Sequence, residues 1–221
     1  MTLSIATALA KAPLLLAVLA SLWLLPADAA EERLTRVDFG QEAVSPEAQE
    51  VADWVVQSAD NGERPFMIID KVQAKVFMFD TAGRLSGAAR ALLGSAIGDD
   101  SVPGIGQRPL SQVKPQERTT PAGRFVASLD RDVKGVEILW IDYDTAFSLH
   151  RVITSQPKER RLQRLATPTP LDKRISFGCV NVPVKFYDTV VHPAFTGTDG
   201  IVYVLPETRP ARAVFGYGAA P

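Results

Sequence analysis

The residues best suited to covalent chemistry in this chain of 221 residues are its single cysteine, Cys179, and one of its two histidines, His150. The thiolate is the nucleophilic form of cysteine, and a free cysteine is mostly protonated at neutral pH. A nearby histidine can accept that proton and leave an imidazolium–thiolate pair. Gly178 directly precedes the cysteine, and a glycine there lets backbone N–H groups approach a developing oxyanion. These residues predict acyl transfer through a thioester.

Each of these residues also has an interpretation without catalysis. Cys179 could be a buried, inert thiol, a common environment for cysteine. His150 could be a structural histidine at a strand end, and His192 stays open as an alternative base. A chain with only two histidines is a poor candidate for a multi-histidine metal site, so we expect no metal.

The elements that must position this pair are predicted as strands. His150 lies in one apolar run, and Cys179 stands just before another. The runs of strand length and β-prone composition are 66–70, 74–79, 136–143, 146–152, 180–184 and 201–205. A helix is expected to begin at Pro46 with Ser45 as its N-cap and to end at 61–62, and a short helix is expected over 186–191. The pattern indicates a mainly β (α+β) domain with one or two short helices.

Two long segments between these elements have no strand pattern. The loop over 94–116 is long enough to be functional or to cover a site. The stretch 151–175 has more basic than acidic residues, and it is either a solvated surface loop or a lid over the active site. A lid would meet carboxylates of a substrate through arginine side chains. The candidates are Arg160, Arg161 and Arg174.

The N-terminus predicts export. Lys11 is followed by an uncharged, apolar run over 12–27, shorter than the roughly 20 residues of a membrane-spanning helix. A small-x-small motif follows the run. This combination is typical of a secretory signal peptide, here cleaved after Ala29. An uncleaved N-terminal anchor is the alternative. We therefore expect a location in the periplasm or cell envelope, with no stable membrane span after cleavage.

Composition and charge limit the remaining classes. The formal net charge of −1 gives no sign of nucleic-acid binding. A single cysteine cannot form an intramolecular disulfide. The expected organisation is a signal peptide over 1–29, an extension with one amphipathic helix over 30–64, a catalytic domain over 65–206 and a tail over 207–221.

Three sequence patterns together point to a known family. The first is Ser-Phe-Gly-Cys-Val-Asn at 176–181 with a histidine upstream, and the second is Thr-Pro-Ala-Gly-Arg-Phe at 120–125. The third is an opening hairpin pattern of Ile68-Ile69, Gln73, the strand 76–79 and Gly83. The chain resembles the catalytic domains of the L,D-transpeptidase (YkuD-like) family, in which these patterns follow one another in the same order along the sequence. The resemblance implies a mixed β-sandwich of that family's kind.

The resemblance also implies roles for the residues that match the family's motif. Cys179 would be the nucleophile, His150 the general base, and the N–H groups of Gly178 and Cys179 would line the oxyanion hole. Ser176 and Asn181 would shape the site. The acyl donor would be a peptidoglycan tetrapeptide stem, attacked at the carbonyl of its third residue with release of the terminal D-alanine, and an amine would resolve the thioester. No metal or organic cofactor is implied.

Two positions depart from the family pattern. Phe177 stands where the family has a histidine, and Arg151 follows His150 where the family usually has a glycine. Two other functions stay open beside transpeptidation. One is hydrolysis on the same scaffold, as an L,D-carboxypeptidase or endopeptidase, and the other is a non-catalytic cell-wall-binding domain. The sequence leaves the acyl acceptor and the oligomeric state undetermined.

Overall fold

The computed structural model describes residues 36–218, so the expected signal peptide lies outside the described residues. The main element is an eight-stranded sheet of mixed direction. Its strands, in order across the sheet, are β3 (Leu85–Arg90), β2 (Lys75–Phe79), β1 (Phe66–Asp70), β10 (Gly200–Val204), β5 (Gly123–Arg131), β6 (Glu137–Asp142), β7 (Phe147–Arg151) and β9 (Val180–Val182). A short parallel pair joins β4 (Leu93–Gly94) to β8 (Arg174–Ser176).

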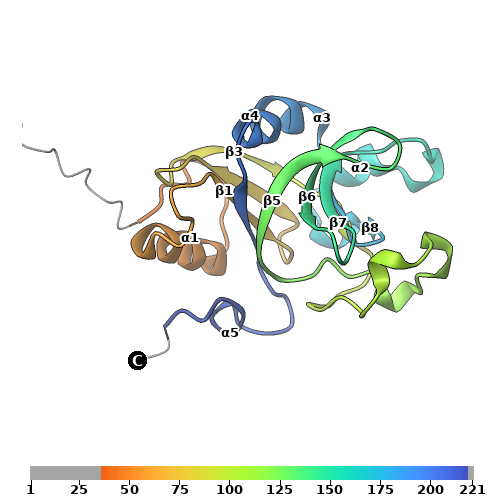
Figure 1. Cartoon of the computed structure of the whole chain (residues 1–221), viewed down its shortest axis with the longest axis horizontal. Coiled ribbons are helices and arrows are strands. Elements are labelled where there is room, and N and C mark those ends of the chain that lie inside the picture. The colour runs from red at the N-terminus through yellow and green to blue at the C-terminus, as the bar shows by residue number, and fades with distance from the viewer. Residues whose placement is uncertain (1–35, 219–221) are drawn as a thin grey trace, which may run out of the picture. The chain divides into compact units, whose positions relative to one another are not determined.

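The central strands of the sheet are covered on both faces. Side chains alternate between the two faces of a strand, and β1 sends Met67 and Ile69 into one core and Phe66 and Ile68 into another. The first core is shared with the curled part of the sheet and with a helical segment that the sequence predicts as a single short helix. That segment comprises α3 (Val184–Phe186), a π-helical turn η6 (Tyr187–Val191) and α4 (His192–Phe195) (Figure 1).

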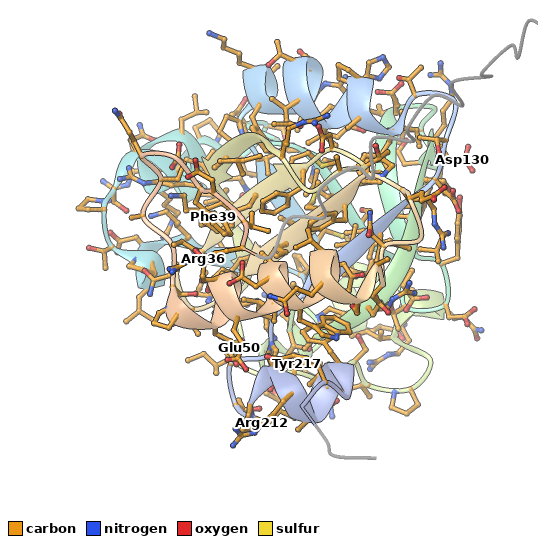
Figure 2. The ribbon with its side chains drawn as sticks, turned by 90° about the vertical axis from the view of Figure 1, so that its left-hand side faces the viewer. Arg36, Phe39, Glu50, Asp130, Arg212 and Tyr217 are labelled. Carbon is orange, nitrogen blue, oxygen red and sulfur yellow. The ribbon has the colours of Figure 1, made fainter. Side chains whose placement is uncertain are left out.

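The second core lies under α1 (Pro46–Ser58). The helix begins as predicted, because the Ser45 Oγ accepts a hydrogen bond from the Ala48 N–H at 3.1 Å. It ends at Ser58, earlier than predicted, because Ala59 takes the left-handed conformation with a φ of 54° and caps the helix. Figure 2 shows α1 lying across the strands, with Tyr217 between it and α5 (Ala211–Phe215). The Tyr217 ring stacks on Trp54 of α1 at a centroid distance of 5.1 Å.

The two segments without a strand pattern contain short helical turns. The segment 94–116 includes η1 (Ile105–Gln107) and η2 (Leu110–Gln112), and η3 (Pro115–Glu117) begins at its end. The segment 151–175 holds η4 (Pro157–Glu159), α2 (Arg161–Ala166) and η5 (Pro170–Lys173). The fold is therefore sheet-rich as expected, with more short helices than the one or two predicted. No helix within residues 36–218 is long and apolar enough to cross a membrane.

Candidate active site

The sheet brings the two predicted catalytic side chains together. Strand β7 pairs with β9 in parallel, with His150 opposite Asn181. Cys179 directly precedes β9, so the same register places it opposite Ser148. Paired residues in a sheet share a face. The four side chains of Ser148, His150, Cys179 and Asn181 therefore gather on one face at the edge of the sheet.

The thiol and the imidazole are each held by neighbours from β7 or the turn before it. The Ser148 hydroxyl donates to the Cys179 Sγ at 3.4 Å, and the Sγ lies 3.6 Å from the Ala146 carbonyl oxygen. The His150 Nδ1 lies 2.8 Å from the carbonyl oxygen of Arg151. A carbonyl oxygen only accepts, so Nδ1 carries a proton and Nε2 is left to exchange one with the thiol.

The environment couples the protonation of the two side chains. Burial alone raises the pKa of Cys179, but hydrogen bonding and charge from His150, together with hydrogen bonds from Ser148, outweigh it and lower that pKa. Burial alone lowers the pKa of His150, but the hydrogen bond and charge of Cys179 and the Arg151 carbonyl outweigh it and raise that pKa. Both directions favour a thiolate beside an imidazolium.

A threonine from the second sequence pattern braces the loop that carries the cysteine. The buried Thr120 hydroxyl donates to the Gly178 carbonyl at 2.8 Å and accepts from the Gly94 N–H at 2.9 Å. Gly178 has a φ of +136°, and a Cβ there would lie 2.7 Å from the Thr119 carbonyl oxygen. The glycine before the cysteine thus allows close approach of the 119–120 backbone. Thr120 is a site residue whose role only the structure reveals.

The remaining motif residues hold the backbone around Cys179. The buried Ser176 hydroxyl donates to the Cys179 carbonyl at 2.6 Å and accepts from the Gly178 N–H at 3.1 Å. The buried Asn181 donates to the same carbonyl at 3.3 Å through Nδ2. The Gly178 N–H, expected to line the oxyanion hole, is therefore engaged by Ser176 in this structure.

The three arginines predicted to bind substrate occupy different environments. Arg160 is exposed and precedes α2 in a left-handed conformation. Arg161 donates to Asn181 Oδ1 at 2.6 Å and pairs with Glu159 at 2.6 Å. Arg174 forms an ion pair with Glu207 and donates to the Lys71 carbonyl at 3.0 Å. Only Arg161 is thus connected to the cysteine, and that connection runs through Asn181.

A cleft opens beside the Cys179 thiol, with a volume of about 80 Å³. The cleft is lined by Phe177, Gly178 and Cys179, by residues 145–147 and by the segment with η1 and η2. Phe177 packs under the Arg118 guanidinium, whose carbon lies 4.1 Å from the ring centroid. The long segment predicted to be functional or to cover a site therefore forms a wall of the cleft. It brings Arg108, which sequence reasoning missed, to the same cleft as the thiol.

Comparison with solved structures finds one kind of domain repeatedly. The catalytic domain of the Enterococcus faecium L,D-transpeptidase is 16% identical over 65% of this chain and 98% of its own, with a TM-score of 0.39. The fold is similar to that of L,D-transpeptidase catalytic domains. An L,D-transpeptidase of Mycobacterium tuberculosis H37Rv is 15% identical over 63% of this chain and 57% of its own, with a TM-score of 0.38.

A third similar structure is the helical cell shape determining protein Pgp2 of Campylobacter jejuni. It is 9% identical over 72% of this chain and 55% of its own, with a TM-score of 0.44. The chain thus spans just over half the length of the second and third of these proteins. No protein-family model and no curated protein matches the sequence. What the chain does is therefore inferred from its own residues.

Proposed function

We propose that the chain is an exported, cysteine-dependent acyltransferase of the L,D-transpeptidase type, acting on peptide stems of peptidoglycan. The observation that supports this most strongly is the coupled pair of Cys179 and His150 beside a cleft. The histidine is held in one tautomer by the Arg151 carbonyl, and its interaction with Cys179 lowers the pKa of the thiol. The sequence patterns around Cys179 and Thr120 supply the substrate class.

In this mechanism His150 acts first as a base and then as an acid. It takes the thiol proton, and the Cys179 Sγ attacks the scissile carbonyl to form a C–S bond. The tetrahedral oxyanion, which we assign to the N–H of Cys179, collapses as the C–N bond breaks, and His150 donates the proton to the departing amine. An acceptor amine then attacks the thioester and gives its proton to His150, which restores the thiolate and the imidazolium.

The buried hydroxyls and amide around the cysteine serve to fix its geometry. Ser176 and Asn181 both donate to the Cys179 carbonyl, and Ser148 donates to the Sγ. Groups held in the geometry of attack lower the barrier because little reorganisation is needed during the reaction. Phe177 takes no part in proton transfer, since a phenyl ring has no exchangeable proton. It contributes an apolar wall of the cleft and a platform for Arg118.

The proposal is tested by trapping the acyl-enzyme. Purified protein is mixed with a tetrapeptide stem, and intact-protein mass spectrometry is expected to show an adduct on Cys179 that Cys179→Ala lacks. The products are then compared with and without an acceptor amine, because a new cross-linked peptide indicates transfer and a shortened stem alone indicates hydrolysis. In cells, overexpressed wild type and Cys179→Ala should give different muropeptide profiles. Identical profiles, together with a thiol that resists alkylation at neutral pH, would contradict an enzymatic role.

A further inference from the structure

Arg108 has a guanidinium edge that no part of the described chain uses. Its Nη1 donates to the two carboxylate oxygens of Glu117 at 3.3 and 3.2 Å. Its Nε and Nη2 are buried and have no hydrogen-bond partner within residues 36–218. Buried donors are nearly always paired in folded proteins, because leaving them unpaired costs free energy. An unpaired edge of this kind calls for a specific explanation.

The geometry of a guanidinium says what this edge would bind. Nε and Nη2 lie side by side in one plane, and their two N–H bonds form a fork that matches the two oxygens of a carboxylate. Glu117 already fixes the other end of the group, and Glu117 itself is held by the Lys114 N–H at 2.8 Å. The guanidinium is thus anchored at Nη1, with its free fork left for a second anion.

The cleft beside Arg108 suits an anionic ligand. Among the described residues that line it, Arg108 is the only one with a permanent charge, and none is an aspartate or glutamate. The rest of the lining is mainly apolar, with leucine, isoleucine and phenylalanine side chains beside a few hydroxyls. A carboxylate bound there would be shielded from water, and its hydrogen bonds to arginine would gain strength from the low local dielectric.

We propose that Arg108 binds the terminal carboxylate of the acyl donor, a proposal that rests on the function proposed above. Arg108 and the Cys179 thiol line one cleft of about 80 Å³, so a carboxylate held by Arg108 lies close to the carbonyl that Cys179 attacks. The terminal carboxylate of the departing residue meets this condition, because one residue separates it from the scissile bond. Both donor atoms are covered in this structure, so the side chain must turn its free edge toward the ligand.

The test compares two tetrapeptide stems that differ only in a terminal carboxylate or a terminal amide. The wild type is expected to acylate with a kcat/KM that is about 10- to 100-fold higher for the acid. Arg108→Gln should lose most of this preference by slowing the acid alone, and Arg108→Lys, which keeps the charge without the fork, should lie between them. Arg209→Gln is the matched control, because Arg209 pairs with Asp100 outside the cleft. An unchanged preference in Arg108→Gln would overturn the proposal.

A binding measurement separates this inference from the proposed function. Calorimetry with Cys179→Ala, with and without Arg108→Gln, measures affinity for the acid and the amide when no acylation occurs. A preference for the acid that depends on Arg108 supports carboxylate binding even if the wild type never acylates. Equal affinity for both peptides, with normal acylation by the wild type, overturns the role of Arg108 and leaves the function intact.

Discussion

The reactivity of Cys179 depends on a histidine that is held by its own strand. The Arg151 carbonyl fixes the His150 tautomer, and His150 in turn lowers the pKa of the buried thiol against the effect of burial. The pKa of Cys179 is lowered and that of His150 is raised, and both shifts favour the ion pair. Acylation should fall below the first pKa, where the thiolate is protonated, and above the second, where the imidazolium that protonates the leaving amine is lost.

This arrangement gives a prediction for His150→Ala. The hydrogen bond and the charge are removed while burial remains, so the pKa of Cys179 should rise to or above the ordinary value of about 8.5. The rate of alkylation by iodoacetamide is measured over roughly pH 5 to 10. At neutral pH this rate should fall about tenfold for each unit by which the pKa of Cys179 rises. His192→Ala is the control, because His192 pairs with Glu137 and not with the thiol. An unchanged alkylation profile in His150→Ala would show that the thiolate does not depend on this imidazole.

The elements differ in how far the sequence could predict them. Strands β1, β2 and β10 are buried on both faces, which requires apolar runs, and such runs are visible without a structure. Helix α2 could not be predicted from the sequence, because only Leu165 of its six residues is buried and the helix therefore has no apolar periodicity. Its position depends on polar contacts such as the bond from the Arg164 Nη1 to the Asp172 carbonyl at 2.8 Å. Contacts of this kind have no periodicity in the sequence.

The residues of the candidate active site also differ in how far the sequence could predict them. Cys179 and His150 could be proposed because their residue types define a chemistry and because they stand at strand ends. Their proximity depends on the parallel register of β7 and β9, which no local pattern specifies. Arg108 could not be found, because a loop arginine has no pattern of its own. Arg174, which the sequence could name, differs from Arg108 in that its charge is engaged by Glu207 and its side chain is mostly buried.

Two adjacent arginines at the start of helix α2, Arg160 before it and Arg161 as its first residue, occupy contrasting positions, which allows a matched comparison. Arg161 bonds to Asn181, which holds the Cys179 carbonyl, and its charge lowers the pKa of His150. Arg161→Gln should therefore raise the pKa of His150 and reduce the acylation rate by about tenfold through misplacement of the cysteine. Arg160→Gln should change neither, because Arg160 is exposed.

The measurements for this pair are an NMR titration of the His150 ring and the pH profile of acylation. A purely structural role for Arg161 would lower the rate without moving the pKa of His150. Equal effects of Arg160→Gln and Arg161→Gln on KM, with no change in the titration, would instead support the simpler view that both arginines bind substrate from the lid.

At the scale of the whole molecule, a buried ionic cluster ties together segments that are distant in sequence. Lys71, in the turn after β1, donates to Asp99 at 2.7 Å and to the carbonyls of Gly98 and Thr120 at 2.7 and 2.8 Å. Glu207 lies 3.6 Å from the same ammonium group and also pairs with Arg174. The cluster therefore links three parts of the chain: the start of the segment 94–116 that forms a wall of the cleft, the threonine that braces the cysteine loop, and the segment after β10.

Adjacent aspartates allow a test of what this cluster contributes to stability. Asp99→Asn removes the nearer of the two carboxylates beside the buried Lys71 ammonium and leaves Glu207 at 3.6 Å, so the free energy of unfolding should fall by up to about 3–5 kcal/mol. Asp100→Asn should cost less than about 1 kcal/mol, because its pair with Arg209 is exposed. Urea unfolding of both variants at neutral pH measures the difference. Equal losses would mean that the buried pair contributes no more than a surface pair does.

The pH dependence of stability gives the same cluster a second, independent readout. Burial tends to raise the pKa of Asp99, but hydrogen bonds from Lys71, from the Thr208 hydroxyl and from the N–H groups of Glu207 and Thr208 lower it to about 2. A carboxyl group with a depressed pKa stabilises the fold above its unfolded value, near 4, and this contribution is lost as the pH falls toward 2. Wild type should therefore lose stability across this window more steeply than Asp99→Asn. The measurement is the free energy of unfolding by urea at a series of pH values from roughly 5 to 2. If it falls in parallel for the two proteins, the acid sensitivity comes from another part of the fold.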